Sequence, residues 1–225
     1  MDGAERPGFR SKPLLSHIRL AALGMLVLSA VFAPPPAHAD KAQTLTLLAK
    51  PPALPDMALG KDKAPITIIE YSSLTCPHCA AFEENVFPML RSKYIDTGKV
   101  RFVSREFPLE LKAAAASMLA RCIAADNAPR YFDAIAMLFK QQDAVIEHTI
   151  ETLKEIGGHF GMSEQDVDAC EKNQEQLDKI SADQKLAFEQ LKVDATPTFF
   201  INGEMFKGSM SFEELDKRLA KLLKR

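Results

Sequence analysis

The spacing of apolar positions changes several times along the chain, and these changes predict the order of its elements. Residues 66–71 form a run rich in β-branched residues, which is typical of a buried central strand, and we expect residues 100–107 to form a second core strand. Residues 80–94 lie between the two runs and have helical spacing. Residues 44–49 are threonine and leucine apart from one alanine, and we expect a short first strand there.

A long helical segment separates these strands from the rest of the chain. Apolar residues recur at helical spacing between residues 111 and 190, and one stripe contains Leu111, Ala115 and Met118. Ser163 followed by Asp166 resembles a capping box and predicts that one of these helices begins there. The segment is therefore expected to be helical throughout.

The last part of the chain returns to a sheet pattern. Residues 198–201 form an apolar strand, and Asn202-Gly203 is a strong signal for a two-residue hairpin turn into residues 204–207. Ser211 and Glu214 then predict a capped amphipathic helix that ends the chain. The pattern as a whole predicts an α/β fold in which a helical segment interrupts the sheet.

The N-terminus has the layout of an export signal. A start containing Arg6, Arg10 and Lys12 precedes the uncharged apolar run at residues 20–33, and residues 37–39 supply a small-x-small cleavage pattern. The run is short for a membrane-spanning helix, which needs about 20 residues. We therefore expect residues 1–39 to be a cleaved signal peptide, with an uncleaved membrane anchor as the alternative.

Composition and charge narrow the class of protein. The sequence is 47% hydrophobic and 26% charged, which is ordinary for a globular domain. Removing residues 1–39, with four basic and two acidic residues, changes the formal net charge from −2 to −4. This charge argues against nucleic acid or an anionic membrane as a partner.

The motif Cys76-Pro77-His78-Cys79 stands between the strand at residues 66–71 and the expected helix. At such a junction the first thiol faces the free N–H groups and the positive dipole end of the helix, which favour a thiolate. The thiolate is the reactive species, so this layout predicts a dithiol redox site. A structural zinc site would need a second ligand pair, and Cys122 and Cys170 stand alone in the sequence, so no metal is expected.

The dithiol motif and a second motif near the end of the chain together resemble a known family. The dithiol and Thr196-Pro197-Thr198 before a strand and an Asn-Gly hairpin are similar to the thioredoxin superfamily. The Cys-Pro-His-Cys form with an intervening helical segment resembles the DsbA family of exported thiol oxidases. The resemblance implies a thioredoxin fold with an inserted helical domain. We expect residues 40–225 to form this domain, with the helical insertion at about residues 109–175.

The resemblance also implies roles for the residues of the motif. Cys76 corresponds to the nucleophile and Cys79 to the resolving thiol, while His78, which follows Pro77, helps to stabilise the Cys76 thiolate. Glu70, six residues before Cys76, corresponds to a buried glutamate that helps to move the proton of the resolving cysteine. A strand-end glutamate that faces solvent is the alternative reading, and the sequence offers Arg105 and Lys63 as cations that could pair with it.

Three further expectations concern the second half of the chain. Pro197 corresponds to a cis proline beside the dithiol, and Thr196 would then offer its backbone to an extended substrate peptide. Cys122 and Cys170 are expected to form a structural disulfide in an oxidising compartment, similar to a second disulfide in some alphaproteobacterial relatives. Two buried free thiols are the alternative.

The expected function is an exported, periplasmic thiol-disulfide oxidoreductase that introduces disulfides into newly exported proteins. It would be a monomer without a prosthetic group, and a membrane quinone reductase of the DsbB type would re-oxidise Cys76–Cys79. A disulfide isomerase or reductase of the same fold is the nearest alternative, because threonine before the cis proline recurs in isomerases. A peptide-binding chaperone module and a glutathione-using isomerase are more distant alternatives.

Overall fold

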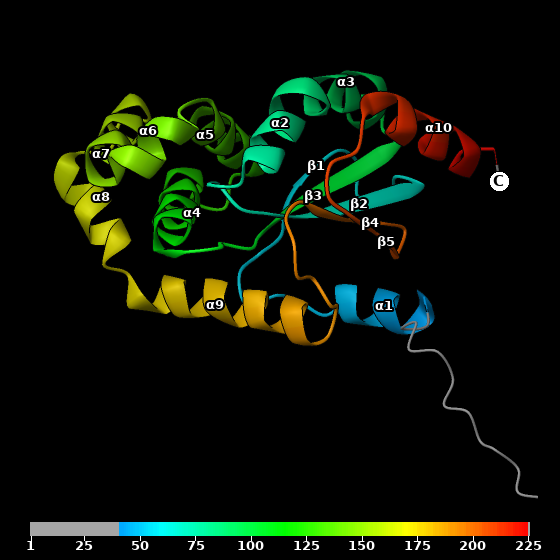
Figure 1. Ribbon diagram of the computed structural model, residues 1–225, viewed down its shortest axis with the longest axis horizontal. Helices are drawn as coiled ribbons and strands as arrows, with labels where there is room; N and C mark the ends of the chain where they lie inside the picture. Colours follow the sequence, from blue (N-terminus) through cyan, green and yellow to red (C-terminus); the bar gives the residue numbers. More distant parts are fainter. Residues whose placement is uncertain (1–40, 225) are drawn as a thin grey trace, which may run out of the picture. The chain divides into compact units, whose positions relative to one another are not determined.

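The computed structural model describes residues 41–224 and contains a five-stranded sheet (Figure 1). The strand order is β1-β3-β2-β4-β5. The strands are β1 Met57–Leu59, β2 Ile66–Ser72, β3 Val100–Glu106, β4 Thr198–Ile201 and β5 Glu204–Lys207. β2 runs parallel to β3 and antiparallel to β4, so it lies in the centre of the sheet. The strands expected at residues 66–71, 100–107, 198–201 and 204–207 are therefore confirmed.

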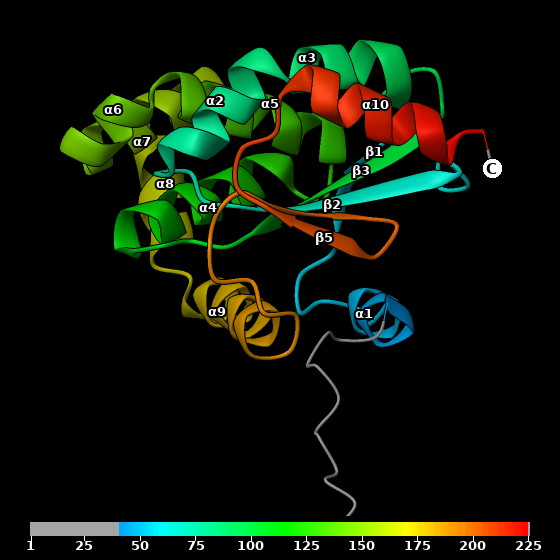
Figure 2. The same cartoon turned by 45° about the vertical axis from the view of Figure 1, so that its right-hand side comes forward.

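Helices cover both faces of this sheet (Figures 1 and 2). On one face lie α2 Pro77–Asn85 and α10 Phe212–Leu222, whose apolar side chains join those of Ile66 and Ile68 in the main core. On the other face, α1 Lys41–Leu48 and α9 Gln174–Glu189 pack near Ile69 and Tyr71. Successive residues of β2 therefore serve two cores, which explains why this strand is apolar almost without alternation.

A group of helices lies beside the sheet, between β3 and β4 in the chain (Figure 1). It comprises α4 Leu111–Ala124, α5 Ala128–Lys140, α6 Gln142–Glu147, α7 Thr149–His159 and α8 Glu164–Glu171. Ser163 and Ser211 each form the expected capping box, at the starts of α8 and α10. Leu111 is 81% exposed, contrary to the expected stripe, because it is the first residue of α4 and lies beyond the buried part of the helix.

The expected strand at residues 44–49 is wrong, because this stretch forms α1. Thr44 and Leu48 are its buried residues, and a spacing of four places them on one helical face. A strand would have buried Thr46 with them, and Thr46 is exposed. The edge strand of the sheet is β1, a three-residue element that pairs antiparallel with β3 and that the sequence pattern did not indicate.

The helix expected at residues 80–94 is divided into three pieces. α2 ends at Asn85, α3 spans Phe87–Leu90, and a π-helical turn, η1, spans Arg91–Ile95. Pro88 explains the break, because it has no N–H to donate and its ring clashes with the carbonyl of Glu84 in a continuous helix. Pro88 is tolerated at this position because it lies in the first turn of α3, where a backbone N–H would have no partner within the helix.

The expected signal peptide, residues 1–39, lies outside the residues that the structure describes. Among residues 41–224, no helix is both long and apolar enough to cross a membrane.

Candidate active site

The dithiol lies where β2 leads into α2. Cys76 is the N-cap of α2 with an extended backbone (φ −85°, ψ 120°), and Pro77 occupies the first turn, where its missing N–H costs nothing. The Cys76 carbonyl accepts hydrogen bonds from the N–H groups of Cys79 and Ala80, both at 3.1 Å. The two cysteines are free thiols, and Cys76 is 5% exposed whereas Cys79 is 1% exposed.

The pKa values of the two thiols are shifted in opposite directions. The pKa of Cys76 is lowered to about 5, chiefly because the Cys79 thiol donates a hydrogen bond to it, and burial opposes this change only in part. The N–H groups of Cys79 and His78 at the helix start lower this pKa further. The pKa of Cys79 is raised by burial, by its hydrogen bond to Cys76 and by the charge of Glu70. At neutral pH the arrangement therefore holds one thiolate and one thiol.

The peptide bond between Thr196 and Pro197 is cis, and this turn lies against Cys76. The Cys76 thiol donates to the Thr196 carbonyl at 3.3 Å. The Thr196 hydroxyl oxygen is buried and has no hydrogen-bond partner among the described residues. Its O–H can turn to the sulfur once Cys76 is a thiolate, and Thr196 accordingly lowers the pKa of Cys76.

His78 is exposed at the surface of α2, as is Pro77. The Nδ1 atom of His78 lies 3.3 Å from the hydroxyl of Ser209, in the loop that precedes α10. The same loop contacts the cis turn, because the N–H of Gly208 donates to the Pro197 carbonyl at 2.8 Å. The dithiol, the cis turn and this loop therefore form one continuous surface. Sequence reasoning did not single out Ser209, which carries no motif.

Glu70 is buried, with 5% exposure, and points toward α2 from the centre of the sheet. Burial raises the pKa of Glu70, and the nearby charges of Glu83 and Cys76 raise it further. Arg105 does not compensate, because it pairs with Asp56 at 2.8 Å and donates to the Tyr71 hydroxyl. No ion pair joins Lys63 to Glu70 in the described part of the chain. Glu70 is therefore a buried carboxyl with a raised pKa close to Cys79, and the solvent-facing alternative is excluded.

Glu83 is a second carboxyl near the dithiol that sequence reasoning missed. Burial raises its pKa to about 7, although the charge of Arg91 lowers it in part. The spacing contained a signal, because Glu83 lies four residues after Cys79 and therefore on the same face of α2. A group with this pKa exchanges protons near neutrality.

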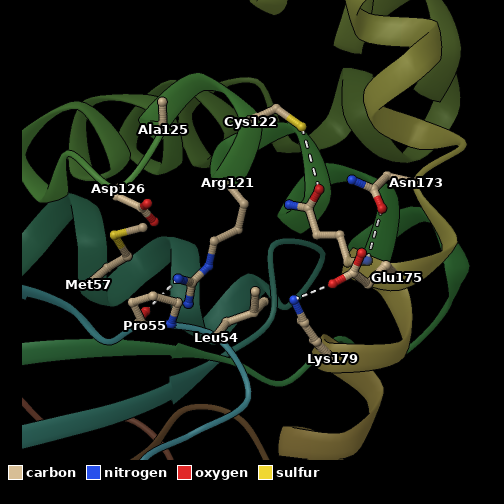
Figure 3. Close-up of a pocket in the computed structure, with 11 residues that line it drawn as sticks. Leu54, Pro55, Met57, Arg121, Cys122, Ala125, Asp126, Asn173, Glu175 and Lys179 are labelled. Carbon is tan, nitrogen blue, oxygen red and sulfur yellow. Dashed lines mark hydrogen bonds and ion pairs between the residues drawn. The ribbon is translucent and has the colours of Figure 1, made fainter.

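Cys122 of α4 and Cys170 of α8 are joined by a disulfide. Cys122 also lines a pocket whose other walls include Asn173, Glu175 and Lys179 (Figure 3). None of the residues that line this pocket belongs to the dithiol segment or to the cis turn. The disulfide therefore joins helices away from the reactive thiols.

Arg121, the residue before Cys122, lines the same pocket (Figure 3). It forms a bidentate pair with Glu106 at 2.5 and 2.7 Å, and both side chains are less than one-tenth exposed. The Tyr131 hydroxyl donates to the same carboxylate at 2.8 Å. This network connects the end of β3 with α4 and α5. Among residues 41–224, no group of three or more potential ligands is arranged to hold a metal ion.

Comparisons with known proteins agree with this geometry. A family model described as thioredoxin matches residues 53–221. A Rickettsia typhi protein named as a candidate protein-disulfide oxidoreductase is 35% identical over 148 residues, which are 66% of this chain and 55% of that protein. The chain thus spans little more than half of that relative's length. Disulfide bond formation protein D of Bacillus subtilis is 28% identical over 174 residues, with 74% and 76% of the two chains covered.

The fold as a whole is also similar to that of a solved structure. The crystal structure of alpha-DsbA1 from Wolbachia pipientis matches with a TM-score of 0.71 and 33% identity, covering 80% of this chain and 95% of that one. The expected thioredoxin fold with inserted helices is thereby confirmed. The chain belongs to the thioredoxin family, in the group that includes the DsbA-type proteins.

Proposed function

We propose that the protein is a thiol-disulfide oxidoreductase of the DsbA type that introduces disulfides into other proteins. The observation that carries the proposal is the contrast between the two thiols of one motif. The pKa of Cys76 is about 5, whereas that of Cys79 is raised. A stabilised thiolate stabilises the reduced dithiol, and the corresponding disulfide is therefore a strong oxidant. The relatives named as disulfide oxidoreductases and disulfide bond formation proteins support the same reaction.

The reaction follows from these roles. A substrate thiolate attacks the Cys76 sulfur of the Cys76–Cys79 disulfide, and the bond breaks as Cys79 leaves with the electron pair. Cys79 takes up a proton, and we assign the buried carboxyl of Glu70 beside it, whose pKa is raised, as the donor. The second substrate thiolate then attacks the substrate sulfur of the mixed disulfide and releases Cys76 as a thiolate. The substrate has then lost two electrons, the enzyme has gained them, and no prosthetic group takes part.

The cis turn provides a place for the substrate. Thr196 borders Cys76, and within residues 41–224 the Cys76 thiol is the one donor found at its carbonyl. Neither the Cys76 thiolate nor the Cys76–Cys79 disulfide can donate to this carbonyl, so it is available to an extended peptide that adds to the edge of the turn. The dithiol and Thr196-Pro197 would in this way bind a substrate cysteine and its flanking backbone together.

The proposal includes the cellular setting. Residues 1–39 would direct the chain out of the cytoplasm, and the mature protein would act as a monomer in the periplasm on exported proteins that are still folding. A membrane quinone reductase of the DsbB type would accept the electrons. Secretion of a reporter fused to residues 1–39, together with the molar mass of the mature protein in solution, tests the first two points.

The decisive test is the equilibrium of Cys76–Cys79 with glutathione, measured on mature protein with Cys122→Ala and Cys170→Ala. A potential well above about −180 mV, the level of protein disulfide isomerase, supports a dedicated oxidant. A potential near about −270 mV, where thioredoxin lies, would mean a reductant and would overturn the proposal.

Thr196 favours one alternative, a disulfide isomerase, because threonine before a cis proline recurs in such enzymes. The isomerase would re-form native disulfides in a scrambled substrate without added oxidant, whereas the oxidase would act on a reduced one. A chaperone that only binds peptides would keep its activity after Cys76→Ala, which the oxidase would lose completely.

A further inference from the structure

Gln142 contacts the dithiol segment from the helical insertion. It is the first residue of α6 and is 8% exposed. Its Nε2 atom donates to the carbonyl of Leu74 at 2.9 Å and to the carbonyl of Cys76 at 3.1 Å. Both partners are acceptors, and only the nitrogen of an amide can donate to them, so the orientation of the amide group is fixed.

The two carbonyls belong to the turn between β2 and α2, which ends at Cys76. Leu74 and Cys76 flank Thr75, and the N–H of Cys76 donates to the Ser73 carbonyl at 3.1 Å. The Cys76 carbonyl is also the acceptor for the first turn of α2. Gln142 therefore holds, from outside, the backbone whose N–H groups face the Cys76 sulfur.

We propose that Gln142 is a positioning residue that ties the Cys76 backbone to the helical insertion and so sets how strongly oxidising the dithiol is. The inference rests on the proposed role of Cys76–Cys79 as the redox pair. Gln142 does not touch the sulfur atoms and acts only through the Cys76 backbone.

The physical reason lies in the difference between the two redox forms. In the reduced form Cys76 holds a negative charge, and its stability depends on N–H groups that point at the sulfur from a fixed backbone. In the oxidised form there is no charge to stabilise, and the disulfide itself restrains the two residues. Loss of the Gln142 donor therefore destabilises the reduced form more than the oxidised form, and the dithiol becomes less oxidising.

A purely structural role makes a different prediction. Without the Gln142 donor the buried Leu74 carbonyl would lose this hydrogen bond, while the Cys76 carbonyl would keep those from Cys79 and Ala80, and the cost would be about the same in both redox forms. Stability would fall, but the equilibrium with glutathione would not change. The redox equilibrium therefore separates positioning from mere support, whatever happens to the unfolding temperature.

The test compares Gln142→Met with Gln141→Met in the full mature protein. Methionine keeps the length of the side chain and removes its donors. Gln141 is the matched control, because it is the preceding residue, is only partly buried and makes no side-chain cap to α6. The measurements are the equilibrium constant with glutathione, with the state of Cys76 and Cys79 read by mass spectrometry, and the pH titration of thiolate absorbance.

We expect Gln142→Met to lower the equilibrium constant for oxidation of glutathione by the Cys76–Cys79 disulfide about tenfold, which corresponds to about 30 mV. The apparent pKa of Cys76 should rise. Gln141→Met should match the wild type in both. A Gln142→Met protein with the wild-type constant would overturn the inference, even if it unfolds more easily. An equal change in Gln141→Met would overturn it as well.

Gln142→Glu provides a second test should Gln142→Met fail to fold. A protonated carboxyl can still donate one hydrogen bond, whereas a carboxylate can only accept and adds a negative charge near Cys76. We expect its equilibrium constant to approach the wild type at low pH and to fall away as the carboxyl ionises. A pH profile parallel to the wild type would count against positioning. A wild-type protein whose Cys76–Cys79 pair does not exchange with glutathione would instead overturn the proposed function itself.

Discussion

The pH dependence of stability in the reduced protein tests the Cys76 thiolate directly. The perturbation is Cys76→Ser, which keeps a small polar side chain and removes the ionisable thiol. The folded-state pKa of Cys76 is about 5, and an unfolded cysteine has a pKa of about 8.5. Because the folded value is depressed, the thiolate contributes stability that is complete above the unfolded pKa and is lost as pH falls through the folded pKa.

The magnitude follows from the two pKa values. Stability should rise between about pH 5 and 8.5 with a limiting slope of about 1.36 kcal/mol per pH unit. At pH 7 this amounts to about 2.7 kcal/mol, which we reduce to about 2 kcal/mol because the neighbouring Pro77 and His78 are exposed and solvent there screens part of the interaction. Above about pH 8.5 stability should fall as pH rises, because Cys79 ionises there in the unfolded chain but not in the folded protein, where its pKa is raised.

The assay is urea unfolding of reduced wild type and reduced Cys76→Ser between pH 5 and 8. Subtracting the two curves removes most of the contribution of the buried Glu70, because the substitution leaves this residue in place. The difference in unfolding free energy should grow by about 2 kcal/mol in favour of the wild type between pH 5 and pH 7. A difference that does not change with pH would refute the lowered pKa, and the proposed oxidising strength would lose its physical basis.

Three further substitutions test the remaining parts of the structure. Glu70→Gln should slow reduction of the oxidised protein by about 10²-fold, because the proton donor for Cys79 is lost, and stopped-flow kinetics with an unchanged rate would contradict this role. Replacing Cys122 and Cys170 together by alanine should cost about 2–4 kcal/mol in urea unfolding and leave the potential of the dithiol unchanged; a large shift in potential would show coupling. Glu106→Gln should cost about 3–5 kcal/mol, because it leaves the buried Arg121 charge without its partner, and a cost below about 1 kcal/mol would argue against this.

Local patterns predicted the parts of the site that are close in sequence. The dithiol at a strand–helix junction follows from the apolar run before Cys76 and the helical spacing after it, and the structure has this layout. Glu70 belongs to the same strand, but its burial depends on α2, which covers that face of the sheet. A strand with two buried faces has no alternation, so the sequence could not decide which way Glu70 points.

Contacts between distant segments escaped the pattern. Gln142 is 66 residues from Cys76 and belongs to a short helix without any motif, so nothing local distinguishes it from a surface glutamine. The prediction that Thr196 lies beside the dithiol likewise rested only on a family resemblance. The wrong strand at α1 has another cause, because eight residues with two buried positions cannot separate a period of 2 from one of 3.6.

The unequal acidities of the two thiols bear on the choice between oxidase and isomerase. On the proposed roles, the mixed disulfide joins the substrate to Cys76, and its release depends on how well Cys76 leaves. A leaving thiol with a lower pKa leaves faster, and the pKa of Cys76 is about 5. The second substrate thiol therefore resolves the intermediate readily and leaves as part of a new disulfide.

An isomerase needs the opposite balance, because it must hold a substrate long enough for its disulfides to rearrange. Return of Cys79 to the mixed disulfide, which would free the substrate unoxidised, is slow because the raised pKa of Cys79 leaves little thiolate to attack. Escape toward oxidised substrate is thus easier than escape toward reduced substrate. The two residues that separate the cysteines, Pro77 and His78, place one thiol at the start of α2 and the other one turn further in, buried near Glu70, and this spacing gives the site both properties.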